Sequence, residues 1–229
     1  MLTEEWAETF AVMARTWERI GATGRGDVAA WDEQLTAMRA EQDRLTRMGR
    51  WTRGPADLMS VAGVHRRELA HSAVLRWLCD PAGSHALGAA FLEQLLGATG
   101  GVTDLLHDAE AATEITRERS RADVVIRGNG WTVVAELKID AGEMPDQCQR
   151  LYEDWRTEPQ PRFVFLTLSG RPPLTATTEP ARRAWQCLSW SEISQLLEKA
   201  VEGRPGAATA VQEYRRTLHA LIGRRLSHP

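Results

Sequence analysis

Residues 121–140, RADVVIRGNGWTVVAELKID, hold one acidic residue before a turn and an acid and a lysine after it. The acids are Asp123 and Glu136, and Lys138 lies two residues beyond the second acid. The chain has 28 lysines and arginines in total, yet only Lys138 and Lys199 are lysine. A lysine is a compact charge whose pKa can fall on burial, whereas an arginine does not lose its proton. Its retention at position 138 therefore favours a chemical role for the ammonium group.

The spacing of these residues predicts that they meet. Side chains on a strand alternate between its two faces, so Glu136 and Lys138 would share one face of a strand over 131–137. The GNG run at 128–130 is typical of a tight hairpin turn, which would bring Asp123 on the preceding strand close to Glu136. Two carboxylates at a strand end suit Mg²⁺, and an ammonium beside them can orient or help deprotonate an attacking water. The alternative is one exposed face of an edge strand.

The hydrophobic pattern predicts helices at both ends of the chain, with strands mainly between them. A Ser189–Glu192 capping box, Ser84 as a cap and Pro145 in a first turn are the clearest helix-start signals. We expect helices over 3–20, 27–45, 64–78, 85–97, 145–155, 191–201 and 207–226, and strands over 112–120, 122–127, 131–137, 162–168 and 185–190. This order predicts an α/β fold with a mixed sheet between helices.

The segment at 51–55, which contains glycine and proline, predicts a domain boundary. We expect residues 1–54 to form an N-terminal helical hairpin and residues 55–229 to form the domain that holds the acids and Lys138. A hairpin of this kind is more often a packing or dimerisation element than a reaction site. It is therefore the candidate contact for a homodimer or for a partner subunit.

Composition excludes several other classes. The 229 residues carry a net charge of −3, so no overall basic field points to nucleic acid, although arginines gather locally around Asp123 at 117, 119, 121 and 127. No apolar run is long enough to cross a membrane, and the acidic start does not resemble a signal peptide, so we expect a cytoplasmic protein. Three scattered cysteines argue against a zinc site or a disulfide framework.

Asp123 and the run Glu136-Leu137-Lys138 resemble the signature of the PD-(D/E)-x-K nuclease superfamily. Two longer segments, ELAHSAVLRWLCDPAGSHALGAAFLEQLL and ELKIDAGEMPDQCQRLYEDW, are similar to a bacterial branch of that superfamily, and together the likeness covers about 64–156. The resemblance implies a restriction-endonuclease-like core of helix, three strands, helix and strand, with further helices at both ends. It departs from the branch at Ala122, where proline is usual, and at Leu137, where asparagine is usual.

The resemblance also assigns roles to particular residues. It implies that Asp123 and Glu136 bind Mg²⁺, with Mn²⁺ as a possible substitute, and that the carbonyl of Leu137 is a third oxygen ligand. Lys138 would act on the nucleophilic water. Glu68 matches an acid that helps to bind the metal, and Gln147 matches a glutamine that supports the site or touches the substrate phosphate.

These observations lead to one main hypothesis and two alternatives. The main hypothesis is a Mg²⁺-dependent nuclease that cleaves DNA to 5′-phosphate and 3′-hydroxyl ends, in bacterial defence or restriction. The alternatives are a catalytically silent module that binds nucleic acid or a protein, and an RNA-cleaving enzyme of the same fold. Simpler roles stay open for single residues: Glu68 and Gln147 as ordinary helix-surface residues, Glu114 and Glu118 as surface charge, and His71 and His85 as buried structural histidines.

Overall fold

The computed structural model describes residues 12, 13, 15, 28, 30–50, 54–101 and 105–223. It divides the chain into two compact units, residues 1–54 and residues 55–229. In the first unit, residues 30–47 are helical and almost entirely exposed, and residues 12, 13 and 15 are helical. Most of the predicted helix over 3–20 and the predicted start of the helix over 27–45 lie outside the described residues. The N-terminal hairpin therefore stays a prediction.

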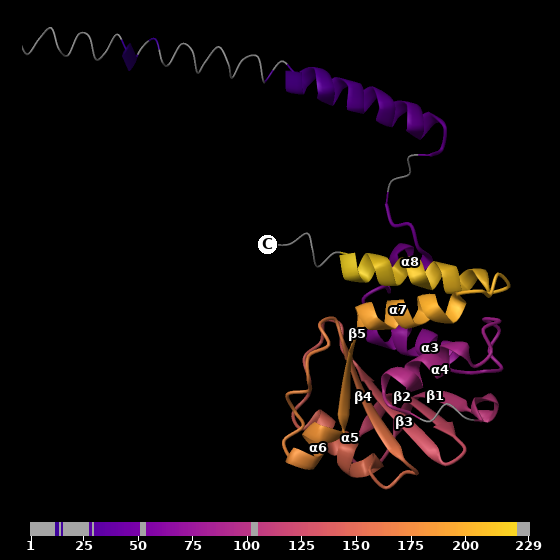
Figure 1. Ribbon diagram of the computed structural model, residues 1–229. Helices are drawn as coiled ribbons and strands as arrows, with labels where there is room; N and C mark the ends of the chain where they lie inside the picture. Colours follow the sequence, from indigo (N-terminus) through magenta and orange to yellow (C-terminus); the bar gives the residue numbers. More distant parts are fainter. Residues whose placement is uncertain are drawn as a thin grey trace, which may run out of the picture. The chain divides into compact units, whose positions relative to one another are not determined.

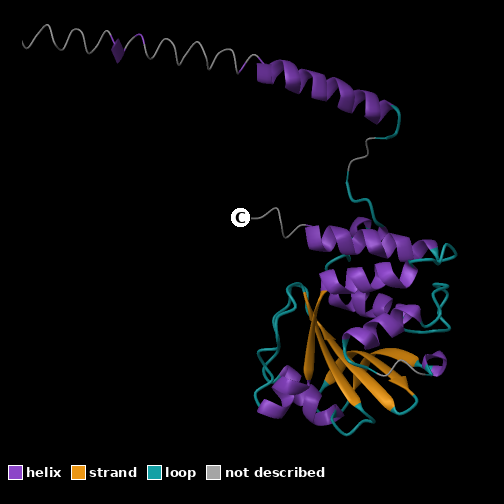
Figure 2. Cartoon of the chain, in the orientation of Figure 1, coloured by secondary structure: helices purple, strands orange, loops and turns teal. Residues whose placement is uncertain are grey.

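The second unit is built on a five-stranded mixed sheet (Figures 1 and 2). The strands β1, β2 and β3 form an antiparallel meander, and β4 and β5 continue the sheet in parallel pairing, in the spatial order β1-β2-β3-β4-β5. Their bounds are Glu110–Thr116, Arg121–Gly128, Trp131–Leu137, Pro161–Thr167 and Trp185–Ser189. The strand that carries Glu136 is thus the central strand and not an edge strand.

Helices cover both faces of the sheet, which confirms the predicted fold class (Figure 2). One face packs against the helices α3, α4, α7 and α8, and the other against α5 and α6. The helices are α2 (Leu58–Val61), α3 (Glu68–Leu78), α4 (Ala90–Ala98), α5 (Gln147–Trp155), α6 (Glu179–Ala184), α7 (Trp190–Val201) and α8 (Thr209–Gly223), and a 3₁₀ turn, η1, spans Leu106–Asp108.

Strand β3 is buried along its whole length because both of its faces are covered. Val133 and Leu137 pack on the side of α3, α4 and α7, whereas Val134 packs on the side of α5 and α6. A strand covered on both faces gains apolar burial at every position. Glu136 has the same parity as Val134, so its side chain is directed towards the α5 side.

Three predicted helix starts are wrong. Helix α3 begins at Glu68 and not at Val64, after Arg67 in extended conformation. Helix α4 begins at Ala90, because residues 80–89 are held as a loop by buried His85, which contacts the Asp80 carbonyl (2.8 Å) and accepts from the Leu87 N–H (3.0 Å). Helix α5 begins at Gln147 after left-handed Asp146, so Pro145 precedes the helix. The capping box at the start of α7 is confirmed.

His71 connects α3, the helix that begins with Glu68, to α8 and to the segment before α3. Its ring is fully buried, with Nδ1 2.9 Å from the Tyr214 hydroxyl on α8 and Nε2 2.8 Å from the His65 carbonyl. Burial lowers the pKa of His71, which favours the neutral ring. The expected structural role of this histidine is confirmed, and the same holds for His85.

We predict that Tyr214→Phe destabilises the protein by about 1–2 kcal/mol, because it leaves a buried ring nitrogen of His71 without its partner. Urea unfolding would measure the change. Tyr152→Phe is the matched control, since Tyr152 is the other tyrosine of the chain and its hydroxyl makes no hydrogen bond within the described residues. Equal effects of the two substitutions would contradict the prediction.

Candidate active site

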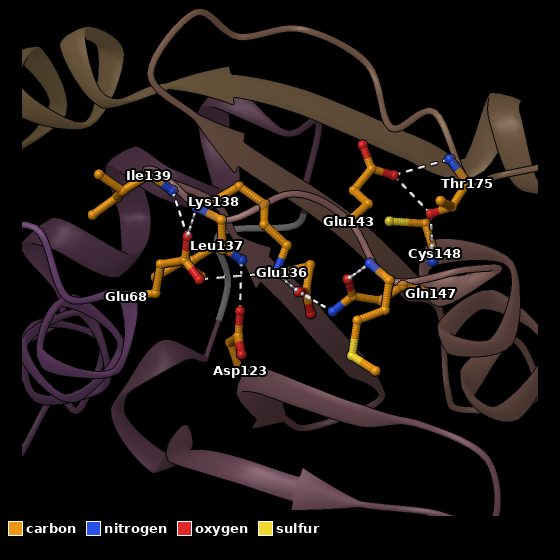
Figure 3. A network of polar contacts seen from close by, with 12 residues as sticks. Glu68, Asp123, Glu136, Leu137, Lys138, Ile139, Glu143, Gln147, Cys148 and Thr175 are labelled. Carbon is orange, nitrogen blue, oxygen red and sulfur yellow. Dashed lines mark hydrogen bonds and ion pairs between the residues drawn. The ribbon is translucent and has the colours of Figure 1, made fainter.

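The antiparallel register of β2 and β3 brings the two predicted acids together. Val124 pairs with Ala135, so Asp123 and Glu136 occupy the next positions along the two strands. The N–H of Leu137 donates to Asp123 Oδ2 at 2.8 Å, which ties the carboxylate of one strand to the backbone of the other (Figure 3). Asp123 is therefore fixed at the same end of the sheet as Glu136.

Glu136 is the most deeply buried acid of the site, with no exposed surface. Its Oε1 accepts a hydrogen bond from Lys138 Nζ at 2.6 Å and another from Gln147 Nε2 (Figure 3). Its Oε2 is buried and has no hydrogen-bond partner among the described residues. A buried carboxylate oxygen without a donor is costly unless a proton or a cation occupies it.

Lys138 follows the last residue of β3 and extends its pairing, since its N–H donates to the Leu166 carbonyl at 2.8 Å. Its side chain is 10% exposed, and its ammonium lies between Glu136 Oε1 at 2.6 Å and Glu68 Oε2 at 3.9 Å. The ammonium therefore bridges a carboxylate of the sheet and a carboxylate of α3.

Glu68 is the first residue of α3 and reaches the chain that leaves β3. Its Oε1 accepts from the N–H of Ile139 at 2.7 Å and, at 3.4 Å, from that of Ala141 (Figure 3). These bonds satisfy backbone donors that the ended strand no longer pairs. Glu68 thus shapes the segment after Lys138 with one oxygen and faces the ammonium with the other.

Gln147, the first residue of α5, has both ends of its amide engaged. Its Oε1 accepts from the Met144 N–H at 3.0 Å, and its Nε2 donates to Glu136. These two contacts fix which end of the amide faces the carboxylate. The structure therefore brings together all the predicted side chains: Glu68, Asp123, Glu136, Lys138 and Gln147.

A second buried acid, Glu143, supports the site; it lies in the segment that resembles the superfamily branch, but the resemblance assigned it no role. Its carboxylate accepts from the Leu174 and Thr175 N–H groups and from the Thr175 hydroxyl, and it forms an ion pair with Arg171. The Thr175 hydroxyl in turn accepts from the N–H of Cys148 at 3.0 Å (Figure 3). Glu143 thereby joins the loop after β4 to the first turn of α5, where Gln147 lies.

The other predicted acids are nearby but differently engaged. Glu114, on β1, has a left-handed backbone with φ of 57° at the point opposite Asp123, and its carboxylate pairs with Arg121 at 2.9 Å. Glu118 lines the cleft that also contains Glu68, Asp123 and Glu136, and it has no ion pair in the described part of the chain. Neither joins the hydrogen-bonded group around Glu136.

All five predicted side chains line one open cleft of about 540 Å³. Its walls come from the turn between β1 and β2, the end of β3, the segment after β3 and the first turns of α5. A cleft of this size, with a few convergent charged groups, is the usual form of a binding site.

A protein-family model, described as the PD-(D/E)XK nuclease superfamily, matches residues 56–220. The chain belongs to this superfamily. The match confirms the resemblance drawn from the motifs and covers the whole sheet and the helices around it. Comparisons with curated proteins and with solved structures gave no match. Within the described residues, no helix is long and apolar enough to span a membrane.

The carboxyl groups of this PD-(D/E)XK site are hard to ionise. Burial, followed by the charge of Asp123, raises the pKa of Glu136 to about 8, and burial raises that of Asp123 to about 6. Burial works against the charged form of Lys138, but the neighbouring carboxylates, Glu136 first, outweigh it and raise its pKa above the ordinary value. The ammonium therefore keeps its charge at neutral pH.

Nucleases of this superfamily typically use divalent metals, and the donors here fit a hard cation. The unpartnered Glu136 Oε2 and the carboxylate of Asp123 supply oxygen where burial disfavours a bare negative charge. Among the described residues, no group of three or more His, Cys, Asp or Glu side chains is positioned to hold an ion. The two carboxylates, completed by water, are the side-chain donor set that these residues can offer.

We predict that Mg²⁺ raises the melting temperature of the protein by about 3–5 °C at pH 8, at roughly tenfold excess over its Kd at that pH. At the same Mg²⁺ concentration, the rise should be smaller at pH 6. Protons compete with the ion for Asp123 and Glu136 up to their raised pKa values of about 6 and 8. Without metal, the free energy of unfolding should fall as the pH rises towards about 8, because the folded state holds the protons of Asp123 and Glu136 more tightly than the unfolded state does.

Glu136→Gln is the control for this thermal-shift experiment, because it keeps the shape of the side chain and removes its charge. We expect little Mg²⁺ shift and a weaker pH dependence for this variant. A wild-type shift that is independent of pH, or an unchanged shift in Glu136→Gln, would contradict the assignment of Glu136 as a ligand.

Proposed function

We propose that this chain is a divalent-metal-dependent nuclease that hydrolyses phosphodiester bonds of DNA, with a role in bacterial defence or restriction. The observation that carries the proposal is the unpartnered, buried Glu136 Oε2 beside the Lys138 ammonium in an open cleft. Membership of a superfamily of nucleases supports the reaction class. The choice of DNA, of Mg²⁺ and of a defence role goes beyond that membership and is part of the proposal.

In this proposal Asp123, Glu136 and the carbonyl of Leu137 hold Mg²⁺ or Mn²⁺, with Glu68 at its periphery. The bound ion would polarise the scissile phosphate as a Lewis acid. Gln147 fixes the Glu136 carboxylate, and Glu68 fixes the chain that carries Lys138. One oxygen of Glu68 is used by backbone N–H groups, so its other oxygen, Oε2, which faces Lys138, is the one that could contact the ion.

The charge of the Lys138 side chain limits the catalytic roles that it can have. Because the carboxylates around it raise its pKa in the protein without metal, the ammonium there is a hydrogen-bond donor and a positive charge at neutral pH. It can orient an attacking water and stabilise the negative charge that develops on the phosphate. Of the two roles considered for this lysine, orientation of the water is the one that the electrostatics favour.

We predict that Lys138→Ala and Asp123→Ala each lower the rate of DNA cleavage by about 100-fold or more. The assay would compare circular, linear and single-stranded DNA with RNA, in Mg²⁺ and in Mn²⁺. Lys199→Ala is the matched control, because Lys199 is the other lysine of the chain and is exposed on α7. We expect this control to cleave like the wild type.

The same assay separates the competing functions. Cleavage of RNA in preference to every DNA form would replace DNA by RNA as the substrate. Failure of the wild type to cleave any substrate faster than Lys138→Ala would leave the binding module as the better account.

We predict that Lys138→Arg loses cleavage activity, although it keeps the positive charge. A guanidinium can donate two parallel hydrogen bonds to a carboxylate, so it would occupy both oxygens of Glu136, whereas the ammonium uses only Oε1. The variant should lose the Mg²⁺-induced rise in melting temperature as well as cleavage. Wild-type metal binding and cleavage by Lys138→Arg would show that only the charge matters.

A further inference from the structure

Arg150 lies in the wall of the catalytic cleft, on the same helix as Gln147. Gln147, Arg150 and Leu151 line the cleft together, which follows from their spacing of three and four residues along α5. The face of α5 that supports Glu136 through Gln147 therefore also presents a guanidinium to the cleft. Arg150 itself is half-buried.

The three other arginines of the cleft are neutralised by carboxylates. These pairs are Arg117 with Glu158, Arg119 with Glu153 and Asp154, and Arg121 with Glu114. Arg117 also stacks over the ring of Trp155, with its guanidinium carbon 3.8 Å from the ring centroid. The positive charge of an arginine paired in this way is already balanced by a carboxylate, so it attracts a further anion less strongly.

Arg150 differs from these arginines because it has no carboxylate partner in the part of the chain that the structure describes. Its Nη1 donates to the Pro145 carbonyl at 2.5 Å, and no described residue accepts from its Nη2 or Nε. The guanidinium therefore keeps free donors inside a cleft that otherwise contains Glu68, Asp123 and Glu136. A fork of free donors matches two oxygens of a phosphate.

We propose that Arg150 binds a phosphate of the nucleic-acid backbone in the catalytic cleft. This inference rests on the proposed nuclease function, because it takes the cleft as the substrate site. A backbone phosphate that approaches the carboxylates is repelled by them, and Arg150 supplies a positive charge from the α5 wall of the same cleft. The contact is to the backbone, so it contributes to affinity for any sequence.

The test is the salt dependence of binding, with Asp123→Asn as a background that does not cleave. Fluorescence anisotropy with a labelled duplex, over a series of KCl concentrations, gives the slope of log K against log [KCl]. Adding Arg150→Gln should lower the magnitude of this slope by about 0.9, the value for one phosphate contact on B-form DNA, and weaken binding by about tenfold. Adding Arg156→Gln, an exposed residue at the end of the same helix, should change neither.

Arg150→Lys distinguishes charge from packing. It should recover most of the salt slope, since a lysine still neutralises one phosphate, and the melting temperature of all the variants should match that of Asp123→Asn. A slope that Arg150→Gln leaves unchanged, or a background protein that binds no duplex in 20 mM KCl, would overturn the inference.

The failure of the inference and the failure of the proposed function give different results. Cleavage by the wild type together with an unchanged slope in Arg150→Gln would remove the phosphate contact and leave the nuclease. An Arg150-dependent slope in a protein that cleaves no substrate would leave the contact and remove the nuclease.

Discussion

The contact on which the site depends is the hydrogen bond from Lys138 to a single oxygen of Glu136. A carboxylate with no exposed surface is stable only if its charge is balanced, and one ammonium balances it from one side. The second oxygen has no donor among the described residues, so it remains available to bind a cation. The energetic cost of this unmet oxygen is what a cation, or a proton below about pH 8, can relieve. The same cost raises the pKa of Glu136 to about 8, because protonation removes the buried negative charge.

Both layers of helices are needed to hold that contact. The α5 side closes over Glu136 through Gln147, whereas the α3 side supplies Glu68 to the chain beyond Lys138. Each of these residues is the first of its helix. Placing the contact residue at a helix start lets the body of the helix pack on the sheet while its first side chain reaches past the sheet's edge. The two cores on either side of β3 therefore set the distance between the charges.

Local patterns in the sequence were sufficient for much of this arrangement. Strand alternation placed Glu136 and Lys138 together, the GNG turn set the hairpin that adds Asp123, and the capping box fixed the start of α7. The misplaced helix starts depended on contacts that are distant in sequence or space, as for Glu68 with the backbone at 139–141, or on a buried side chain, as for His85. Glu143 was missed because its partners, Arg171 and Thr175, are about thirty residues away and have no periodic relation to it.

Arginine clusters in a sequence do not by themselves mark a surface that binds phosphate. The group at 117, 119, 121 and 127 suggested local affinity for nucleic acid, yet each of its members pairs with an acid of the same unit. Among the described residues of the cleft, the arginine without a carboxylate partner is Arg150, which has no basic neighbour in the sequence. A positive charge inside the cleft that no carboxylate balances, and not the density of charge along the chain, is therefore the property that indicates where a substrate phosphate would bind.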